Sequence, residues 1–154
     1  MTEPSLTQLA AMVRTLQDRD QIARLIQTYA RGVDRRDWDL VRSCFDPDAV
    51  VEGSRTSAPL GPYLDTLIPG VEYYPSTMHF MGNQLVEVDG DRGQVETYAV
   101  AYHWRGDQPG AEHPENLVVG VRYHDTVTRR GAGWVIVKRR TDPDWQIGPY
   151  PPGP

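Results

Sequence analysis

The chain has little of what marks a secreted, membrane-spanning or nucleic-acid-binding protein. One cysteine, Cys44, among 154 residues excludes an internal disulfide. The first twenty residues carry five charges and no apolar run, and no stretch approaches the roughly 18 apolar residues of a transmembrane helix. The 16 Lys and Arg residues stand against 21 Asp and Glu, without the basic excess that binds phosphate backbones. We therefore expect a cytoplasmic protein with no membrane partner and no nucleic-acid partner.

Signature motifs of common catalytic and cofactor sites are also absent. There is no glycine-rich phosphate loop, no Gly-x-Ser-x-Gly elbow, no Cys-x-x-Cys pair and no His-Glu-x-x-His helix. The histidines lack the close pair spacing that would support a facial metal site. We therefore expect no metal and no cofactor, and any chemistry has to come from polar side chains that the fold places inside.

Proline and glycine are abundant, with 13 and 14 residues. Their combined share stays below the roughly 25 to 30% that is typical of disordered chains. The glycines mostly separate predicted strands, and the prolines gather in residues 58–75, in the loop at 106–114 and in the tail. We interpret these segments as the rim of a covered pocket.

Helical periodicity dominates the first half of the chain. An apolar stripe over residues 18–33 predicts a one-sided helix, with Asp18 and Gln21 as its capping pair. A weaker stripe of the same kind precedes it over residues 6–16. The rest of this half is predicted as a short helix capped by Asp37 and ended by Asp46-Pro47-Asp48, a short strand at 49–52 and a short helix around 63–68.

The second half is rich in Val, Tyr, Thr and Trp and predicts four long strands joined by turn residues. Sequential strands of this kind form an antiparallel meander, so we expect an α+β fold in which a curved antiparallel sheet wraps around the N-terminal helices. Residues 1–141 form one domain in this prediction. The Pro-rich tail 142–154 is not expected to continue a central strand. The predicted long strands are residues 77–88, 93–105, 116–129 and 133–141.

Four side chains are the candidates for chemistry. Asp34 follows the helix predicted over residues 18–33, at an end where the helix dipole does not favour a carboxylate. The simpler alternative is an exposed acid in a charged turn. Tyr29 lies one turn earlier on the apolar stripe, a position that equally suits a core tyrosine. His79 and His103 lie on successive predicted strands among large apolar residues. Imidazole exchanges protons near neutral pH, and a neighbouring carboxylate fixes its tautomer.

The sequence resembles a known family in three places. These are the strings YARGVDRRDWDLVRSCF and TMHFMGN and the final strand GWVIVKRRTDPDW. Over about residues 10 to 145 the chain is similar to the SnoaL-like branch of the nuclear transport factor 2-like superfamily. That resemblance implies a cone: a strongly curved sheet around long helices, with a pocket open at one end.

Two branches of the superfamily inform the site. The chain resembles scytalone dehydratase at residues 33–38 and at the two pocket histidines, which fall on His79 and His103. It resembles bile-acid 7α-dehydratase at Tyr29, Asp34 and His79. The resemblance implies acid/base elimination of water, with His79 as general base and then acid, Asp34 orienting it, Tyr29 donating to a substrate oxygen and His103 as a second proton donor or anchor.

We therefore expect a cofactor-free dehydratase (lyase) or isomerase that acts on a hydrophobic cyclic small molecule of polyketide, steroid or terpenoid kind. The alternatives are a noncatalytic binding or assembly module of the same fold, and a polyketide cyclase or epoxide-type hydrolase. Arg122 either points inward, to bind an enolate or carboxylate, or outward into solvent. The predicted apolar wall consists of Trp38, Tyr63, Tyr73, Met78, Phe80 and Tyr98.

Two expectations concern the outside of the molecule. The strands are apolar on both faces, which favours a homodimer or homotrimer formed through the sheet. The tail, with Trp145 and Tyr150, is expected to fold over the pocket as a lid.

Overall fold

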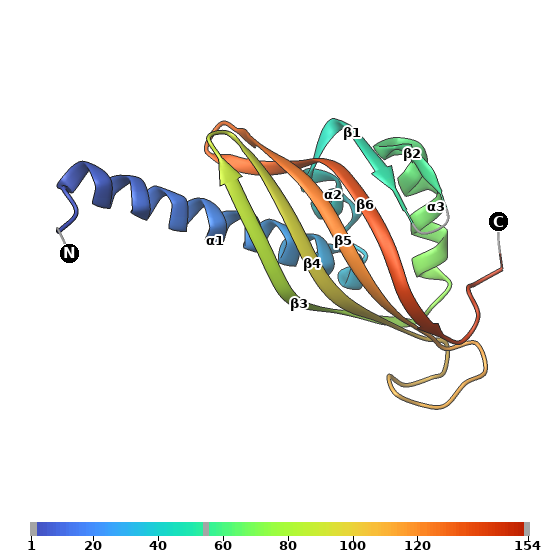
Figure 1. The fold of residues 1–154 in the computed structure, drawn as a ribbon. Coiled ribbons are helices and arrows are strands. Elements are labelled where there is room, and N and C mark those ends of the chain that lie inside the picture. The colour runs from blue at the N-terminus through green and yellow to red at the C-terminus, as the bar shows by residue number, and fades with distance from the viewer. Residues whose placement is uncertain (1–2, 54–55, 153–154) are drawn as a thin grey trace.

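A curved sheet wraps around one half of a long helix (Figure 1). The structure is a computed structural model that describes residues 3–53 and 56–152. The helices come first in the chain and the long strands follow, so the predicted α+β arrangement is confirmed. The elements are α1 (Leu6–Arg35), α2 (Trp38–Ser43), β1 (Phe45–Glu52), β2 (Ser57–Pro59), α3 (Leu60–Glu72), β3 (Ser76–Asp89), β4 (Arg92–Trp104), β5 (Leu117–Arg130) and β6 (Gly133–Ile147).

The sheet has six strands in the order β2-β1-β6-β5-β4-β3. The antiparallel meander from β3 to β6 is as predicted. However, β1 pairs with β6 in parallel, so the sheet is mixed and the expectation of a purely antiparallel sheet is wrong at this pair. The three-residue strand β2, which pairs with β1, was not predicted from the sequence.

The two helical stripes predicted separately form one 30-residue helix, α1. Its start is a capping box in which Ser5 and Gln8 satisfy each other's backbone N–H groups. The predicted cap at Asp18 is therefore wrong. Instead, Asp18 Oδ1 accepts hydrogen bonds from Arg129 Nη2 at 2.8 Å and from Trp134 Nε1 at 3.4 Å, which ties the middle of α1 to the sheet.

The last strand continues past its predicted end at Thr141, because β6 runs to Ile147 and keeps pairing with β5. Proline is tolerated at position 143 because the pairing of β6 with β1 stops at Arg140. From there on β6 is an edge strand, which does not require an N–H group on its open side. The first half of the tail is therefore part of the sheet.

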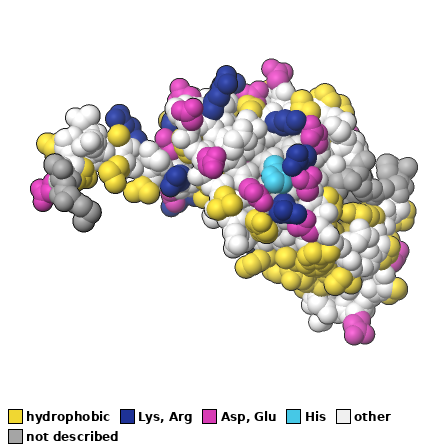
Figure 2. All heavy atoms as spheres, in the orientation of Figure 1, with side chains coloured by type: hydrophobic (Ala, Val, Ile, Leu, Met, Phe, Trp, Pro, Cys, Tyr) yellow, Lys and Arg dark blue, Asp and Glu magenta, His cyan; other side chains and the backbone are white. Residues whose placement is uncertain are grey.

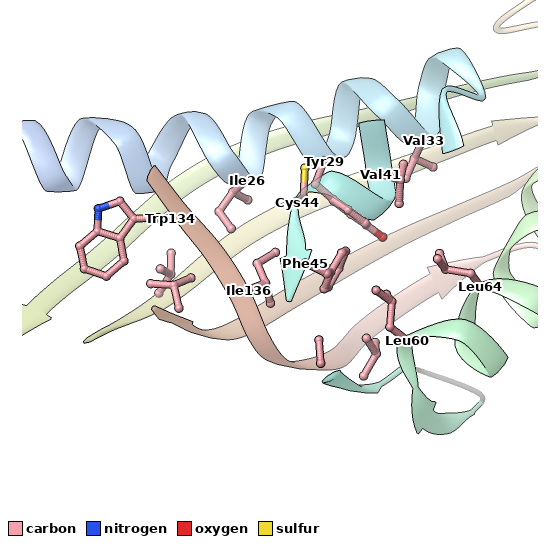
Figure 3. Close-up of a cluster of buried hydrophobic side chains, with 14 of the residues drawn as sticks. Ile26, Tyr29, Val33, Val41, Cys44, Phe45, Leu60, Leu64, Trp134 and Ile136 are labelled. Carbon is pink, nitrogen blue, oxygen red and sulfur yellow. The ribbon is translucent and has the colours of Figure 1, made fainter. Parts of the chain in front are cut away.

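Side chains on the strands alternate between the two faces of the sheet. On β5, the odd-numbered side chains from Val119 to Val127 are buried on the inner, concave face, while their even-numbered neighbours other than Gly120 are more exposed. The largest buried cluster joins α1, α2, α3 and the inner face (Figure 3). A second cluster lies on the inner face near the other end of the strands and contains Tyr74, Ala99, Leu117, Val119, Val121 and Tyr123.

No helix in the described part of the chain is both long and apolar enough to cross a membrane.

Candidate active site

A cavity of about 160 Å³ opens between α1, α3 and the inner face of the sheet. Its wall is mainly apolar and carries several phenol groups, which suits a compact ligand with a few polar atoms. It is lined by three residues that were predicted to carry chemistry, Tyr29, His79 and His103. Tyr63 on α3, which was predicted for the apolar wall, also lines it. The other lining residues include Leu67, Val71, Tyr74, Ala101, Leu117, Val119, Val121, Tyr123 and Thr141.

Asp34 and His79 form a tightly bonded pair at the edge of this cavity. Asp34 Oδ1 lies 2.7 Å from His79 Nδ1, and the backbone N–H of His79 donates to Asp34 Oδ2 at 2.8 Å. The His79 side chain is 7% exposed and that of Asp34 21%. Because a carboxylate accepts hydrogen bonds only, Nδ1 carries a proton, and in the neutral ring Nε2 holds the lone pair. No hydrogen bond in the described part of the chain engages Nε2.

The hydrogen bonds at Asp34 keep it ionised. Burial alone would raise the pKa of this carboxyl, but the bonds and charge from His79, together with the Thr77 hydroxyl, outweigh burial and lower it. Asp34 does not line the cavity itself. It is a positioning residue that acts through His79.

Arg36 fixes the place where Asp34 and His79 meet. It follows α1 with a positive φ of 54°, which turns the chain out of the helix. Its Nη1 donates to the Asp34 carbonyl oxygen and to Thr77 Oγ1, both at 2.9 Å, and its Nη2 donates to the Tyr74 carbonyl oxygen at 2.7 Å. Thr77 Oγ1 in turn donates to Asp34 Oδ1 at 3.0 Å. One guanidinium therefore holds the end of α1 against the start of β3, a role that sequence reasoning missed.

His103 faces His79 across the strand pair, with ring centroids 5.7 Å apart. His103 pairs with Thr77 on β3, which lies two residues before His79. Side chains two residues apart on a strand share a face, so both histidines point to the inner face. Burial, followed by the neighbouring His79, lowers the pKa of His103 to about 4. Nδ1 lies 3.3 Å from the Leu117 carbonyl oxygen, to which the neutral ring donates. A neutral ring at pH 7 suits a substrate anchor better than the predicted second proton donor.

A buried ion pair lies behind the cavity and was not predicted from the sequence. Arg139 Nε and Nη2 bind the two carboxylate oxygens of Asp125 at 2.7 and 2.8 Å, and both side chains are fully buried. The guanidinium carbon lies 4.0 Å from the ring centre of Tyr29 and 4.6 Å from that of Tyr123. Within the described residues, Arg139 Nη1 has no hydrogen-bond partner. Two phenols of the cavity wall are thus backed by a fixed positive charge.

Tyr29, Tyr63 and Tyr123 stay protonated at neutral pH. Burial raises the pKa of Tyr29, and Arg139 opposes this effect without reversing it. Burial also raises the pKa of Tyr63 and of Tyr123, and the nearby Tyr29 adds to the rise in both. These hydroxyls are therefore available as hydrogen-bond donors to a ligand.

The structure corrects several predicted wall residues. Met78, Phe80, Tyr98 and Arg122 have even numbers on β3, β4 and β5 and lie on the outer face, away from the cavity. Arg122 forms a bidentate ion pair with Asp144 there, so its predicted role in binding an enolate is wrong.

Trp38 and Tyr73 are partly buried and do not line the cavity. Trp38 packs against the core and donates from Nε1 to Glu72 at 3.0 Å. The hydroxyl of Tyr73 donates to Glu115 at 2.6 Å and ties the end of α3 to the loop between β4 and β5. Both side chains therefore act through packing and hydrogen bonds outside the cavity.

Other chemistries find little support in the described residues. They contain no cluster of three or more His, Cys, Asp or Glu side chains that could hold a metal ion. Burial raises the pKa of the Cys44 thiol to about 11, which keeps it protonated and a poor nucleophile. The pair of Asp34 and His79 is thus the strongest candidate for chemistry.

Comparison with known proteins identifies the family. The model of the SnoaL-like domain matches residues 14–140. The chain belongs to the SnoaL-like family. The uncharacterized protein Rv2910c of Mycobacterium tuberculosis is 27% identical to it over 133 residues, which span 82% of this chain and 86% of the relative.

Several solved structures share the fold. An NTF2-like protein with a cystatin-like fold from Novosphingobium aromaticivorans matches with a TM-score of 0.73 and 26% identity, over 91% of this chain and 90% of its own. A candidate scytalone dehydratase from the same organism matches with a TM-score of 0.77 and 18% identity, over 90% and 92%. The hexachlorocyclohexane dehydrochlorinase LinA type 2 matches with a TM-score of 0.73 and 20% identity, over 92% and 99%.

Proposed function

We propose that this SnoaL-like protein is a cofactor-free lyase that eliminates a small leaving group from a compact cyclic substrate. The observation that carries the proposal is the hydrogen-bonded pair of Asp34 and His79 at the cavity wall, with His79 Nε2 left as the base. A general base needs an unprotonated atom within reach of the substrate and a partner that stabilises the cation it becomes. Asp34 supplies that partner.

The proposed reaction begins when His79 Nε2 removes a proton from a ring carbon. The electron pair of that C–H bond forms a double bond to the adjacent carbon, and the leaving group departs from that carbon with its bonding electrons. The imidazolium is held by the Asp34 carboxylate and can return its proton to a departing hydroxide or to solvent. No oxidant or cofactor is needed for this balance.

Negative charge develops on the departing group or on a conjugated oxygen. Tyr29 lines the cavity, and the buried Arg139 guanidinium lies against its ring. Fixed dipoles and charges in a site with little water stabilise such charge strongly, because they need no rearrangement during the reaction. Tyr29 thus serves as the donor to the substrate, and Arg139 supports it from behind.

The cavity volume limits the size of the proposed substrate. About 160 Å³ is close to the roughly 150 Å³ cavity that holds a benzene molecule in another protein. A single substituted six-membered ring of polyketide or terpenoid kind suits this volume, whereas a steroid would have to extend through the mouth. The two named neighbours act, by their names, on scytalone and on hexachlorocyclohexane.

The test is turnover of a panel that contains scytalone, hexachlorocyclohexane and simple cyclic β-hydroxyketones. The product double bond is followed by ultraviolet absorbance and chloride release by ion chromatography. For any compound turned over, we expect His79→Ala to lower kcat by at least about 10²-fold, the usual contribution of general base catalysis. Asp34→Asn should lower kcat with little change in KM, since Asp34 acts through His79. Tyr98→Phe, on the outer face, is the matched control and should keep wild-type rates.

The competing function is a noncatalytic binding module. It would be favoured if the wild-type protein binds cyclic compounds but turns none of them over. A His79→Ala variant that keeps the full rate would instead overturn the assignment of His79 as the base. The described structure offers the binding module no polar anchor that the lyase does not also use.

A further inference from the structure

The first third of α1 projects away from the rest of the molecule (Figures 1 and 2). Every residue from 3 to 17 is exposed, and the first buried side chain of the helix is Ile22. The hydrogen bonds of Asp18 to Arg129 and Trp134 mark the point where the helix leaves the sheet. The match to the family model begins only at residue 14, so most of this projection precedes the shared domain.

The projecting segment carries an apolar stripe of its own. Leu6, Leu9, Val13 and Leu16 follow a 3-4-3 spacing, with exposed fractions between 42% and 85%. Such spacing places side chains in one line along a helix and is the seam pattern of paired helices. Over residues 6–17 the only charged side chain is Arg14. Interface cores are depleted in charge in the same way.

This stripe is not an extension of the face that packs on the sheet. The buried side chains of α1 in the body include Ile22, Ile26, Tyr29 and Val33. At about 100° of rotation per residue, the mean direction of the projecting stripe differs from theirs by roughly 150°. The stripe therefore points nearly away from the concave face, and the protein's own sheet cannot cover it.

A helical segment of this length is marginal in water by itself, because a helix shorter than about 12 to 15 residues gains too little to offset nucleation. The capping box at Ser5 gives it a defined start, and its continuity with the body of α1 removes the nucleation cost. A partner that covers the stripe would complete its stabilisation.

We propose that the stripe of Leu6, Leu9, Val13 and Leu16 pairs with the same stripe of a second copy of this chain, forming a two-helix contact between two molecules. The stripe has Leu at both ends, and the small side chain of Ala10 flanks it near its middle, which lets two identical helices approach closely. Without acidic residues in the segment, and with one basic residue beside the stripe, little charge opposes the contact. Pairing of like with like closes after two copies, whereas insertion of the helix into a different surface of a neighbour would propagate unless its rotation closes a ring.

The experiment compares two double variants by sedimentation velocity over a range of protein concentrations. Leu9→Glu with Leu16→Glu puts two charges into the stripe. Ala11→Glu with Thr15→Glu puts the same charges on the opposite side of the same helical segment. We expect the stripe variant to halve the mass of the assembly and to raise its dissociation constant at least about tenfold, while the control keeps the wild-type mass.

Removal of residues 1–16 is the second variant, and it should reproduce the stripe variant. All variants should keep the unfolding midpoint of the body, because every described side chain that is changed or removed is exposed. Equal masses for the stripe variant and the control would overturn the proposal. So would a wild-type protein that sediments as a monomer at every concentration.

Discussion

His103, which is partly buried across from His79, makes the stability of the protein dependent on pH. The pKa of His103 in the folded protein is about 4 because burial disfavours its charged form, whereas an unfolded histidine titrates near 6.5. Between these values the unfolded chain binds more protons than the folded one. The free energy of unfolding therefore falls as the pH drops from about 6.5 to about 4.

We expect the titration of His103 to lower the free energy of unfolding by about 2 kcal/mol when the pH falls from 7 to 5. Urea unfolding at both pH values measures it, and His103→Gln should remove the loss. His113→Gln, in the loop between β4 and β5, serves as the control and should leave it in place. The lowered pKa of Asp34 acts in a separate window, because its contribution is lost only as the pH falls below about 4. Equal slopes for His103→Gln and the wild type would contradict the burial argument.

Sequence reasoning grouped the four candidate catalytic residues at one site, whereas it misplaced several residues of the cavity wall. Tyr29, Asp34, His79 and His103 were identified from helix and strand positions and from the family resemblance, and the structure brings all four together. The incorrect prediction of Met78 and Phe80 as wall residues could have been avoided with a simple rule. Side chains of one parity on a strand share a face, so the choice of His79 as an inner residue already assigns Met78 and Phe80 to the outer face.

The pair of Asp125 and Arg139 was missed for a different reason. Charged residues on a strand are usually exposed, and nothing local indicates that two of them, 14 positions apart, neutralise each other in the core. Parity again offered a signal for Asp125, which has the same parity as Val121, Tyr123 and Val127. Arg139 gave no such signal, because a register shift between β5 and β6 near Val127 disturbs the alternation.

At the scale of elements, local sequence patterns predicted the helical stretches of α1 and the four long strands. The remaining pairings depend on contacts between distant parts of the chain, which local patterns do not reveal. The contact of β1 with β6 joins strands about 90 residues apart, and no periodicity in β1 distinguishes a parallel from an antiparallel neighbour. The end of β6 depended on the same contact, since the strand tolerates Pro143 only where β1 has stopped pairing.

The segment after β6 lies at the cavity wall. Tyr150 and Pro151 are among the lining residues, which is where the expected lid would place them. The chain turns into this position at Gly148, whose φ is +87° and where an added Cβ would lie 1.8 Å from the Asn116 carbonyl oxygen. A side chain at position 148 is therefore incompatible with the observed turn.

We expect Gly148→Ala to displace the tail and to weaken binding of a six-membered-ring probe such as cyclohexenone by about tenfold, through loss of enclosed apolar contact. A chain that ends at Gly148 should show the same loss. Gly131→Ala is the control, because its φ is also positive but no atom lies near its added Cβ. Affinity is measured by NMR titration. A truncated chain with unchanged affinity would show that the tail is no lid.

At the scale of the whole molecule, the outer face of the sheet divides into a charged band and an apolar patch (Figure 2). The band holds ion pairs of both signs, including those of Arg122 with Asp144 and of Arg140 with Asp142. The patch lies beside it towards the cavity end of the strands. It consists of Met78, Phe80, Tyr98, Tyr102, Trp104, Trp145 and Ile147, of which Tyr102 and Trp104 stack with ring centres 5.4 Å apart.

Exposed aromatic groups of this kind dominate the energetics of protein interfaces, and isolated domains rarely expose them together. The neighbouring band carries acids and bases side by side, so a rotated second copy can place its arginines on the aspartates of the first. These features support the homodimer or homotrimer through the sheet that we expect from the sequence, as a contact separate from the pairing of the projecting helices.

We expect Phe80→Lys combined with Ile147→Lys to dissociate the contact through the sheet, because a lysine ammonium in an apolar interface loses its hydration without gaining a partner. Thr126→Lys with Thr128→Lys adds the same charge on the outer face near the opposite end of β5 and should leave the assembly intact. Light scattering after gel filtration gives the mass. In a chain that already lacks residues 1–16, the patch variant should yield a monomer and the control a dimer or trimer, so the two contacts are separated. A single mass for both variants would show that the apolar patch serves no assembly of this chain.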